Sequence, residues 1–415
     1  MNVVIVGNFW FPYGTASAAR IRNLALGLRE CGARVHVITM TPYPRLNGGD
    51  SRAGLHEGIS YECVSPFMAA VDGWRDEQCS IPKLRNRLSD KLRWFAGMYA
   101  GAPFALRQLR RRIEAGQCDL VIAYDRSALR MTPLARLCRA YNVPAVLDVV
   151  ELSEHLKVRR LNAVYWDSVV GTRRTPRLFA GLTVISAGLE EMYRRKGCSR
   201  TLIVPALEGW APAPVQPPTG NPTFRLTYVG ALQSRDAPEL LIEAVRLLAQ
   251  EDWPITLDLI GHYEGTTRGR EFAARCAADP ALARHVRFLG TLSDEAMGQH
   301  LAASDGLVLT RRAAPTEELS FPTRLVEYLR NGRPVFISDV GDVSRYLEDD
   351  REVILLHPSD PRLIAEKIAS VASRPDRGAE IGRRGREAGA RAFNRTSHAA
   401  RLLEFAAGLR VKAAS

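Results

Sequence analysis

Short apolar runs alternate with amphipathic runs along almost the whole chain. The first residues, NVVIVG, form a β-branched apolar run, and apolar residues then recur at three- and four-residue spacing in SAARIRNLALGLRECG, which ends at Gly32. Further apolar runs follow in ARVHVITM, CDLVIAY, VPAVLDVVE and GLTVIS, with helical patterns between the later ones. A repeated alternation of strand and helix predicts a parallel sheet with helices on both faces.

A proline- and glycine-rich stretch, APAPVQPPTGNP at 211–222, interrupts this alternation and predicts a linker. After it the alternation restarts with the apolar runs FRLTYVG, ITLDLIG, VRFLG, GLVLT, PVFIS and VILLH. Helices are predicted at 237–250, near 271–277, at 293–303 and, over about three turns, from near Phe321. The fold class is therefore α/β, with two doubly wound domains facing a central cleft and the ligand expected at the carboxyl ends of the strands.

The domain boundaries follow from the same pattern. An N-terminal domain is predicted at 1–212 and a C-terminal domain at 213–390. The region 362–409 is helical in pattern almost throughout, with a break near Pro375, and 391–415 is predicted to pack back towards the N-terminal domain.

Charge and cysteine usage narrow the function. The formal charge of +12 indicates an anionic partner, which charge alone leaves open among nucleic acid, an acidic membrane surface and phosphorylated ligands. Within 82–116 the stretches PKLRNRLSDKLRWF and LRQLRRRIEAG are basic with leucines at helical spacing, which fits either a solvated helix face or a membrane-surface or acidic-acceptor site. Seven scattered cysteines without CxxC spacing, and no signal-peptide or membrane-span pattern, favour a cytoplasmic protein.

Several familiar catalytic motifs are missing from the sequence. The first strand is followed by GNFWFPYGTAS, whose glycines are too far apart for G-x-G-x-x-G. The chain also lacks the GxxxxGK[ST] phosphate loop, HExxH, a D-x-D pair and the GxSxG elbow. These absences weaken dehydrogenase, ATPase, zinc-peptidase and hydrolase readings.

Two strand-to-helix turns carry candidate anion-binding groups. In FPYGTASAAR the small residues from Gly14 onwards would let backbone N–H groups approach an anion, although a simple turn with Ser17 as N-cap explains them equally. In YVGALQSRDAPELL the strand ends at Gly230, and Arg235 stands ahead of the next helix, where it could clamp phosphate or lie on the surface.

The stretch ELSFPTRLVEYLRNGRPV carries the strongest candidate. Pro322 suits the first turn of a helix, and Asn331-Gly332 supplies its stop. Free N–H groups near Thr323 would favour a phosphate, and Glu327, one turn deeper on the same side, could accept bonds from sugar hydroxyls. The alternative is a surface pair of Glu327 with a neighbouring arginine.

Taken with the runs from YVGAL at 228 to REVILLHPSDPRLIAEKIASV, this stretch makes the chain resemble the GT-B fold glycosyltransferases, and among them the retaining, nucleotide-sugar-dependent family 4. Its form, P-[ST]-[KR]-hydrophobic-x-E-Y, resembles a subgroup common among bacterial surface-polysaccharide transferases. In the family's E-x7-E motif the second Glu falls on Glu327 and is implied to bind ribose. The first, which usually contacts the donor sugar, falls on Leu319, although Glu317 and Glu318 lie close by.

The resemblance implies roles for further residues. The donor nucleotide sugar would be bound by two groups of residues, namely Gly14, Thr15, Gly230 and Arg235, and Thr291, Leu292, Pro322, Thr323, Arg324, Leu325 and Glu327. Within this set the 323–325 amides would hold the diphosphate, 291–292 would touch the base, and the basic ligand at Arg235 is uncertain by one position. Catalysis is assigned to Arg235, Arg324 and Glu151, the last aligned loosely with the family's His-Asp region, for which Asp148 and His155 are weaker counterparts.

The implied activity is transfer of a sugar, with retention, from a nucleotide-diphosphate sugar to a hydroxyl acceptor in cell-surface glycan or glycolipid synthesis. No cofactor and no metal are expected, and a UDP- or GDP-sugar is the expected co-substrate. Expected partners are a glycan or lipid-linked acceptor and, through 82–116, an anionic membrane at its inner face, with no nucleic acid. A GT-B fold sugar-nucleotide epimerase and a non-catalytic nucleotide-sugar-binding homologue are the alternatives.

Overall fold

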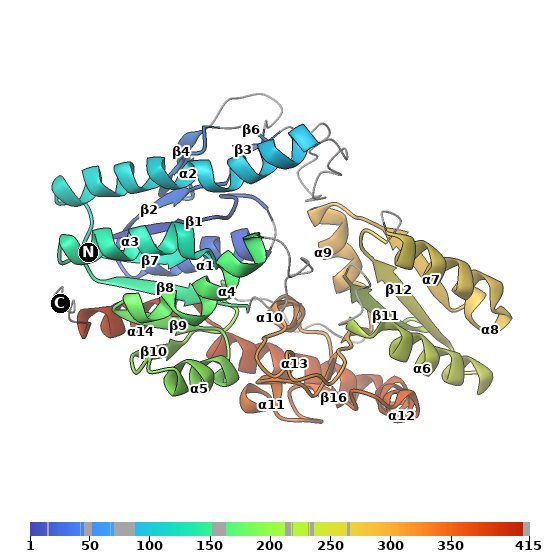
Figure 1. The fold of residues 1–415 in the computed structure, drawn as a ribbon. Coiled ribbons are helices and arrows are strands. Elements are labelled where there is room, and N and C mark those ends of the chain that lie inside the picture. Colours follow the sequence, from blue (N-terminus) through green and yellow to red (C-terminus); the bar gives the residue numbers. More distant parts are fainter. Residues whose placement is uncertain are drawn as a thin grey trace. The chain divides into compact units, whose positions relative to one another are not determined.

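The computed structural model describes residues 1–14, 16–41, 43–44, 52–66, 68–69, 88–151, 163–211, 217, 219–230, 232, 236–263 and 266–409. Contacts divide the chain into two compact units (Figure 1). Unit 1 comprises Met1–Gly209 and Arg395–Ser415, and unit 2 comprises Trp210–Asn394. These divisions fall within a few residues of the boundaries that the sequence pattern predicts after 212 and 390.

Unit 1 is built on an eight-stranded sheet. In spatial order its strands are β10 (Thr201–Ile203), β9 (Gly181–Val184), β8 (Ala145–Val149), β7 (Leu120–Tyr124), β1 (Asn2–Gly7), β2 (Arg34–Thr39), β5 (Ile59–Cys63) and β4 (Ala53–His56). Neighbours pair in parallel except β4, which runs antiparallel to β5. Two short strands, β3 (Tyr43–Pro44) and β6 (Met68–Ala69), pair separately.

Helices cover both faces of this sheet, so β1 is buried on each side, as its continuous apolar run predicts. Its residues Val3 and Ile5 share one core with α1 (Ala16–Glu30) and α14 (Arg395–Ala407). Val4 and Val6 point to the opposite face, where α2 (Leu88–Glu114), α3 (Ala128–Ala140) and α4 (Ala163–Arg173) are neighbours (Figure 1). A 3-10 helix (Thr175–Leu178) and α5 (Ala187–Arg195) complete the unit.

Unit 2 is built on a six-stranded sheet whose neighbours all pair in parallel. Its order is β13 (Val286–Gly290), β12 (Ile255–Ile260), β11 (Phe224–Val229), β14 (Gly306–Leu309), β15 (Val335–Ser338) and β16 (Ile354–Leu356). Its helices are α6 (Pro238–Gln250), α7 (Thr267–Ala278), α8 (Pro280–Ala283), α9 (Asp294–Ala302), α10 (Thr323–Arg330), α11 (Val343–Tyr346), α12 (Pro361–Ala372) and α13 (Pro375–Ala392). The predicted α/β fold with two doubly wound domains is confirmed.

The C-terminal helical region divides differently from its prediction. The expected break near Pro375 separates α12 from α13, but a second break at Phe393 and Asn394 separates α13 from α14. This second break is where the chain leaves unit 2 and returns to unit 1. The return is fixed by close helix packing, because a Cβ at Gly27 of α1 would overlap the carbonyl oxygen of Arg395.

The helix predicted from near Phe321 is shorter than expected. It begins at Thr323 and has eight residues, about two turns rather than three. Pro322 is not in its first turn but is its N-cap, with an extended ψ of 92°. The physical reason is that a proline disfavours helical conformation in the residue before it, and Phe321 is held instead by edge contacts with the rings of Tyr346 and Phe393.

Candidate functional site

The strand order of unit 2 reverses between β11 and β14, because β12 and β13 extend the sheet in one direction and β15 and β16 in the other. Ligands of doubly wound sheets bind at such a point, outside the carboxyl ends of the strands. The two chain segments that leave there are tied together, since the Thr310 hydroxyl donates to the Asp236 carbonyl at 2.7 Å. A Cβ at Gly261, at the end of β12, would overlap the carbonyl oxygen of Gly230, so this edge of the sheet is closely packed backbone.

Helix α10 is docked on this edge by its apolar face. Leu325, Tyr328 and Leu329 are fully buried, in agreement with the predicted apolar face. The Tyr328 hydroxyl accepts a hydrogen bond from the Val229 backbone N–H at 2.8 Å, which joins the helix to the carboxyl end of β11. Burial raises the pKa of Tyr328 well above its ordinary value, so this tyrosine stays neutral.

The first amides of α10 are available for a ligand only in part. Within the described residues, the backbone N–H groups of Thr323 and Arg324 have no hydrogen-bond partner, and Pro322 provides no side-chain cap. The Leu325 N–H already donates to the Pro322 carbonyl at 3.0 Å. Of the three amides assigned to a diphosphate, two are therefore open, and the dipole of the helix favours an anion beside them.

Glu327 lies one turn deeper and is paired with Arg324. Arg324 Nη1 is 2.8 Å from Glu327 Oε2, and the side chains are 38% and 45% exposed. The alternative of a surface ion pair is thus the contact present in the structure. The pair stands on the same side of α10 as the open amides, so it offers a guanidinium and a carboxylate to a ligand bound at that helix end.

The turn before α10 contains a buried ion pair that the sequence reasoning did not identify. Arg311 Nη1 is 2.6 Å from Glu317 Oε2, and both side chains are at least nine-tenths buried. The Ser320 hydroxyl lies 3.2 Å from the same carboxylate oxygen, and the Arg311 backbone N–H donates to Ser338 Oγ at 2.8 Å. Leu319 is half buried and Glu318 is exposed, so Glu317 is the buried acid of this turn.

The other proposed contacts in unit 2 come from neighbouring strand ends. Thr291 and Leu292 follow Gly290, the last residue of β13, and are half buried ahead of α9. The Gly261 N–H donates to the Gly290 carbonyl at 2.7 Å, which aligns the ends of β12 and β13. Gly230 directly follows β11, and Arg235 lies outside the described residues.

In unit 1 the strand order reverses between β1 and β7, and the candidate glycine lies in the loop after β1. Gly14 has φ +150°, and a Cβ there would stand about 3.0 Å from that of Trp10, so both conformation and space favour glycine. Thr15 lies outside the described residues. Ser17 is the second residue of α1, so the interpretation of Ser17 as its N-cap is wrong.

The acidic candidates after β8 have different environments. Glu151 Oε2 is 2.8 Å from Arg126 Nη1, and both side chains reach solvent at the carboxyl edge of the sheet. Asp148 lies within β8, where Arg20 binds both its carboxylate oxygens at 2.7 Å and the Thr183 hydroxyl donates at 2.8 Å. Because it is buried and fully paired, Asp148 is a structural residue rather than a catalytic one. His155 lies outside the described residues.

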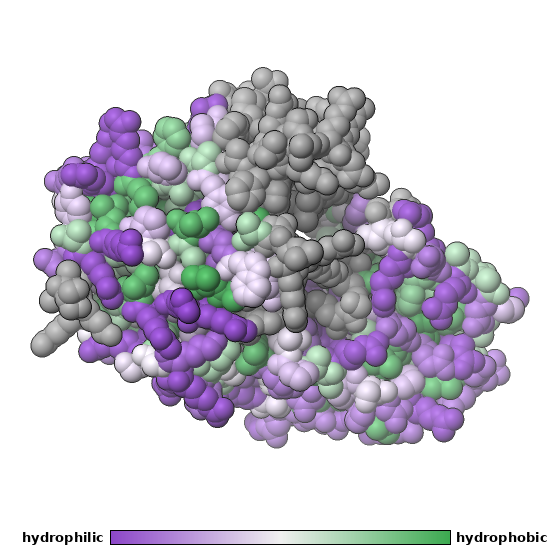
Figure 2. Space-filling model, in the orientation of Figure 1, coloured by the Kyte–Doolittle hydropathy of each residue, from purple (hydrophilic) through white to green (hydrophobic). Residues whose placement is uncertain are grey.

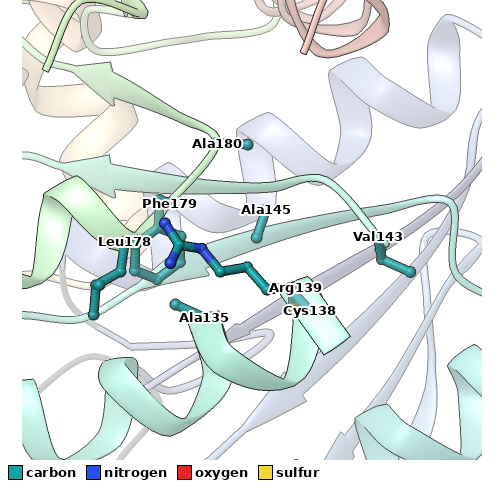
Figure 3. Close-up of a pocket in the computed structure, with 8 residues that line it drawn as sticks. All are labelled: Ala135, Cys138, Arg139, Val143, Ala145, Leu178, Phe179 and Ala180. Atoms are coloured by element: carbon teal, nitrogen blue, oxygen red, sulfur yellow. The ribbon is translucent and has the colours of Figure 1, made fainter. Parts of the chain in front are cut away.

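One hollow of unit 1 lies away from these groups (Figure 3). It is lined by Ala135, Cys138, Arg139, Val143, Ala145, Leu178, Phe179 and Ala180. Ala145 is the first residue of β8, so the hollow is at the amino ends of the strands, opposite the edge where ligands of this fold bind. Burial raises the pKa of the Cys138 thiol, which leaves it an unreactive thiol.

Comparison with known protein families finds a match for each of the two units. Residues 15–207 match the "Glycosyl transferase 4-like domain" model, and residues 223–374 match "Glycosyl transferases group 1". The chain is built from two glycosyltransferase domains. The first of them runs from the start of α1 to the end of the last strand of unit 1, β10, and the second covers the β11–β14 edge and α10.

Relatives of these glycosyltransferase domains agree with this assignment. A D-inositol 3-phosphate glycosyltransferase of Geodermatophilus obscurus is 29% identical over 154 residues, which are 36% of this chain and 33% of the relative. The chain thus spans about a third of the length of the curated relatives it matches.

Solved structures resemble the fold over nearly all of the chain. Sucrose-phosphate synthase of Thermosynechococcus elongatus superimposes with a TM-score of 0.70 at 17% identity, covering 97% of this chain and 98% of that one. HepE of Anabaena, in complex with UDP and glucose, superimposes with a TM-score of 0.67 at 16% identity, covering 99% and 100%. The GT-B type of fold expected from the sequence is confirmed by these neighbours.

Proposed function

We propose that this chain transfers a sugar from a nucleoside diphosphate sugar to a hydroxyl acceptor. The observation that carries the proposal is the end of α10. It offers two open amides and an Arg324–Glu327 pair at the reversal point of a sheet that belongs to a group 1 glycosyltransferase domain. The HepE structure, similar in fold, is in complex with UDP and glucose, which supports a uridine or related nucleotide as the donor.

In this proposal the chemistry is stabilisation of a leaving nucleoside diphosphate. Negative charge develops on the diphosphate as the bond to the sugar breaks, and preorganised donors that face this charge lower the barrier. The Thr323 and Arg324 amides, with the Arg324 guanidinium, would supply such donors without a metal ion. The Glu327 carboxylate, held beside them, would accept hydrogen bonds from ribose hydroxyls.

The stereochemical course and the acceptor side belong to the same proposal. Transfer is proposed to proceed with retention, and the acceptor to be a glycan or a lipid-linked sugar that reaches Glu151 and its neighbours at the carboxyl edge of unit 1. Proton NMR of the anomeric signal in the product tests the first point. Loss of turnover, with donor binding retained, in Glu151→Gln tests the second.

The donor assignment is tested by binding and turnover together. The protein is screened against UDP-, GDP-, ADP- and dTDP-sugars by thermal shift, and release of nucleoside diphosphate is then measured with the best binder, with and without EDTA. We expect Arg324→Ala and Glu327→Ala to weaken binding about tenfold or more, since each removes a charged contact. Glu348→Ala is a matched control, because Glu348 forms an i,i+3 pair with Arg351 ahead of β16.

The result separates the proposal from its alternatives. Unchanged binding in both α10 variants would show that the donor binds elsewhere. A sugar nucleotide recovered with solvent deuterium on its ring would indicate an epimerase, and tight binding without turnover would indicate a non-catalytic homologue.

We also propose that unit 1 associates with an anionic membrane at the cytoplasmic face. Nothing in the described part of the chain forms a helix long and apolar enough to span a bilayer. Of the basic segment 82–116, residues 82–87 lie outside the described residues, but the visible end of α2 exposes Arg107, Arg110 and Arg111. Such clustered arginines attract anionic headgroups.

Exposed apolar side chains of unit 1 support the same proposal. Phe104 of α2 is 48% exposed, Leu129 of α3 is 63% exposed and Trp166 of α4 is 56% exposed. Figure 2 shows hydrophobic residues interspersed with hydrophilic ones over α3 and α4. Exposed aromatic and aliphatic side chains on a basic unit suit the headgroup region of a bilayer.

Vesicle sedimentation tests this surface. Binding to phosphatidylglycerol vesicles, but not to phosphatidylcholine vesicles, is expected for the wild type and is expected to fall after joint neutralisation of Arg107, Arg110 and Arg111. Leu363→Ala, an exposed apolar position on α12 of unit 2, is the control. Equal sedimentation of the neutralised protein would remove this part of the proposal.

A further inference from the structure

Three aromatic side chains pack together directly before helix α10. The ring centroid of Phe321 lies 6.0 Å from that of Tyr346 and 5.4 Å from that of Phe393, and the centroids of Tyr346 and Phe393 are 5.2 Å apart. Phe321 is 4% exposed and Phe393 is fully buried. Aromatic pairs at such separations attract one another beyond the apolar area that they bury, so the cluster fixes the residue that precedes Pro322.

The cluster joins segments that are far apart in the chain. Tyr346 is the last residue of α11, and Phe393 is the C-cap of α13. The loop that leads into α11 also lies against the turn before α10, because a Cβ at Gly341 would stand 3.0 Å from the Ser320 carbonyl oxygen. The start of α10 is therefore held by α11 and by the end of α13.

The C-terminal end of α10 is fixed by a different part of α13. Arg386 donates through Nη1 to the Arg330 carbonyl and through Nη2 to the Ala211 carbonyl, the latter at 2.5 Å. A Cβ at Gly389 would stand 3.2 Å from that of Leu329, so the two helices are in close contact there. These contacts hold the end of the helix that lies away from the open amides.

The N-terminal end of α10 depends on its surroundings for its position. A helix of eight residues is too short to be stable alone, and this one has no side-chain cap. Its first turn is closed by the Leu325 N–H, which donates to the Pro322 carbonyl at 3.0 Å. The side chain just before this turn, Phe321, is the one that the aromatic cluster holds.

We propose that Phe393 is a positioning residue for sugar transfer, which acts through Phe321 to set the place of the Thr323 and Arg324 amides. This inference rests on the proposed function, and it gives a part in the reaction to a residue that works only through another side chain. Donors stabilise the charge that develops on a leaving diphosphate only when they are held in place beforehand. A small displacement of such groups by a distant substitution costs turnover.

Phe393→Leu tests the proposal, because it removes the ring and keeps an apolar side chain. We expect faster hydrogen exchange of the Leu325 amide, which reports the order of the first turn. With the donor sugar that binds best, kcat for release of nucleoside diphosphate should fall about tenfold or more. KM should rise only roughly two- to threefold, because the amides act mainly on charge that develops in the transition state.

Phe336→Leu is the matched control. Phe336 of β15 is also fully buried in unit 2, and its ring contacts Phe224, the first residue of β11, so it lies at the amino edge of the sheet. The same substitution there should lower Tm to a similar extent. Exchange at Leu325 and kcat, both measured well below the Tm of either variant, should stay at their wild-type values.

The outcomes separate the inference from the proposed function. Faster exchange together with a lower kcat in Phe393→Leu, and neither change in Phe336→Leu, supports the inference. A change in only one of the two measurements, a change in neither, or equal losses in both variants overturns it and leaves the proposed function intact. A wild type that binds no donor and releases no nucleoside diphosphate overturns both.

A milder variant keeps the test valid if Phe393→Leu does not fold. Tyr346→Leu removes the ring that contacts both phenylalanines of the cluster, and Tyr346 is only half buried, so less apolar packing is lost. The same two changes, faster exchange at Leu325 and a lower kcat, are expected in this variant. Wild-type values of both in a folded Tyr346→Leu protein overturn the inference.

Discussion

The hydroxyl of Tyr328 holds helix α10 on its sheet, and its removal in Tyr328→Phe should loosen unit 2. The hydroxyl is fully buried and accepts from the Val229 N–H at 2.8 Å. Phenylalanine keeps the ring and its packing but leaves a buried amide unpaired, which costs about 1–3 kcal/mol. The same substitution at Tyr228 removes a buried hydroxyl that bonds the Asp236 side chain but leaves the bond between Tyr328 and the Val229 amide in place, so it is the control variant.

Comparing the two variants separates loss of the Val229 bond from loss of a buried tyrosine hydroxyl in general. For a unit of this size, 1 kcal/mol corresponds to roughly 2–4 °C in Tm. Calorimetry should therefore place the Tm of Tyr328→Phe several degrees below that of the wild type, and hydrogen exchange should show faster exchange of the Val229 amide in Tyr328→Phe but not in Tyr228→Phe. A wild-type Tm and wild-type exchange at Val229 in Tyr328→Phe would refute the reasoning, because the bond would then contribute nothing to the stability of α10.

Three further predictions concern the scaffold. Asp148→Asn should destabilise unit 1 by about 3–5 kcal/mol, measured by urea unfolding, because it leaves a buried arginine without its charge partner. Gly27→Ala should displace α14 and expose the C-terminal helix to limited proteolysis, since a Cβ overlaps the backbone of α14. Burial opposes the charge of Asp258, but hydrogen bonds from His300 and Arg287 outweigh it and lower its pKa. A lowered folded-state pKa stabilises above the unfolded value of about 3.9 and is lost as pH falls through the folded value, so the wild type should lose more stability than Asp258→Asn between about pH 5 and 3.

Sequence periodicity predicted the order of strands and helices because both sheets are parallel and their strands are continuous apolar runs. It placed the start of α10 too early because the pattern of apolar residues continues through Phe321, although that ring belongs to an aromatic cluster with Tyr346 and Phe393. These two residues lie further along the chain, and no local sequence pattern indicates that they contact Phe321. The break before α14 was missed for the same reason, since Arg395 is fixed by its packing against Gly27.

Sequence spacing brought candidate residues together where they stand on one segment. It could not do so where the residues come from segments far apart in the chain. Thr323, Arg324 and Glu327 stand on one short helix, so their spacing alone brought them together. The pairing of Asp148 with Arg20 joins residues 128 positions apart and changes a catalytic candidate into a structural group. The buried pair of Arg311 with Glu317 had one local signal that the sequence reasoning did not use, namely an arginine directly after the buried apolar run GLVLT.

The turn has leucine rather than an acid at position 319, and its buried acid is Glu317, two residues earlier. An acid that contacts a sugar needs a free carboxylate, and that of Glu317 is buried against Arg311 and Ser320. Glu317 is therefore not a substitute for the acid but the anchor of a guanidinium. Glu318 is exposed and has no such anchoring contact among the described residues.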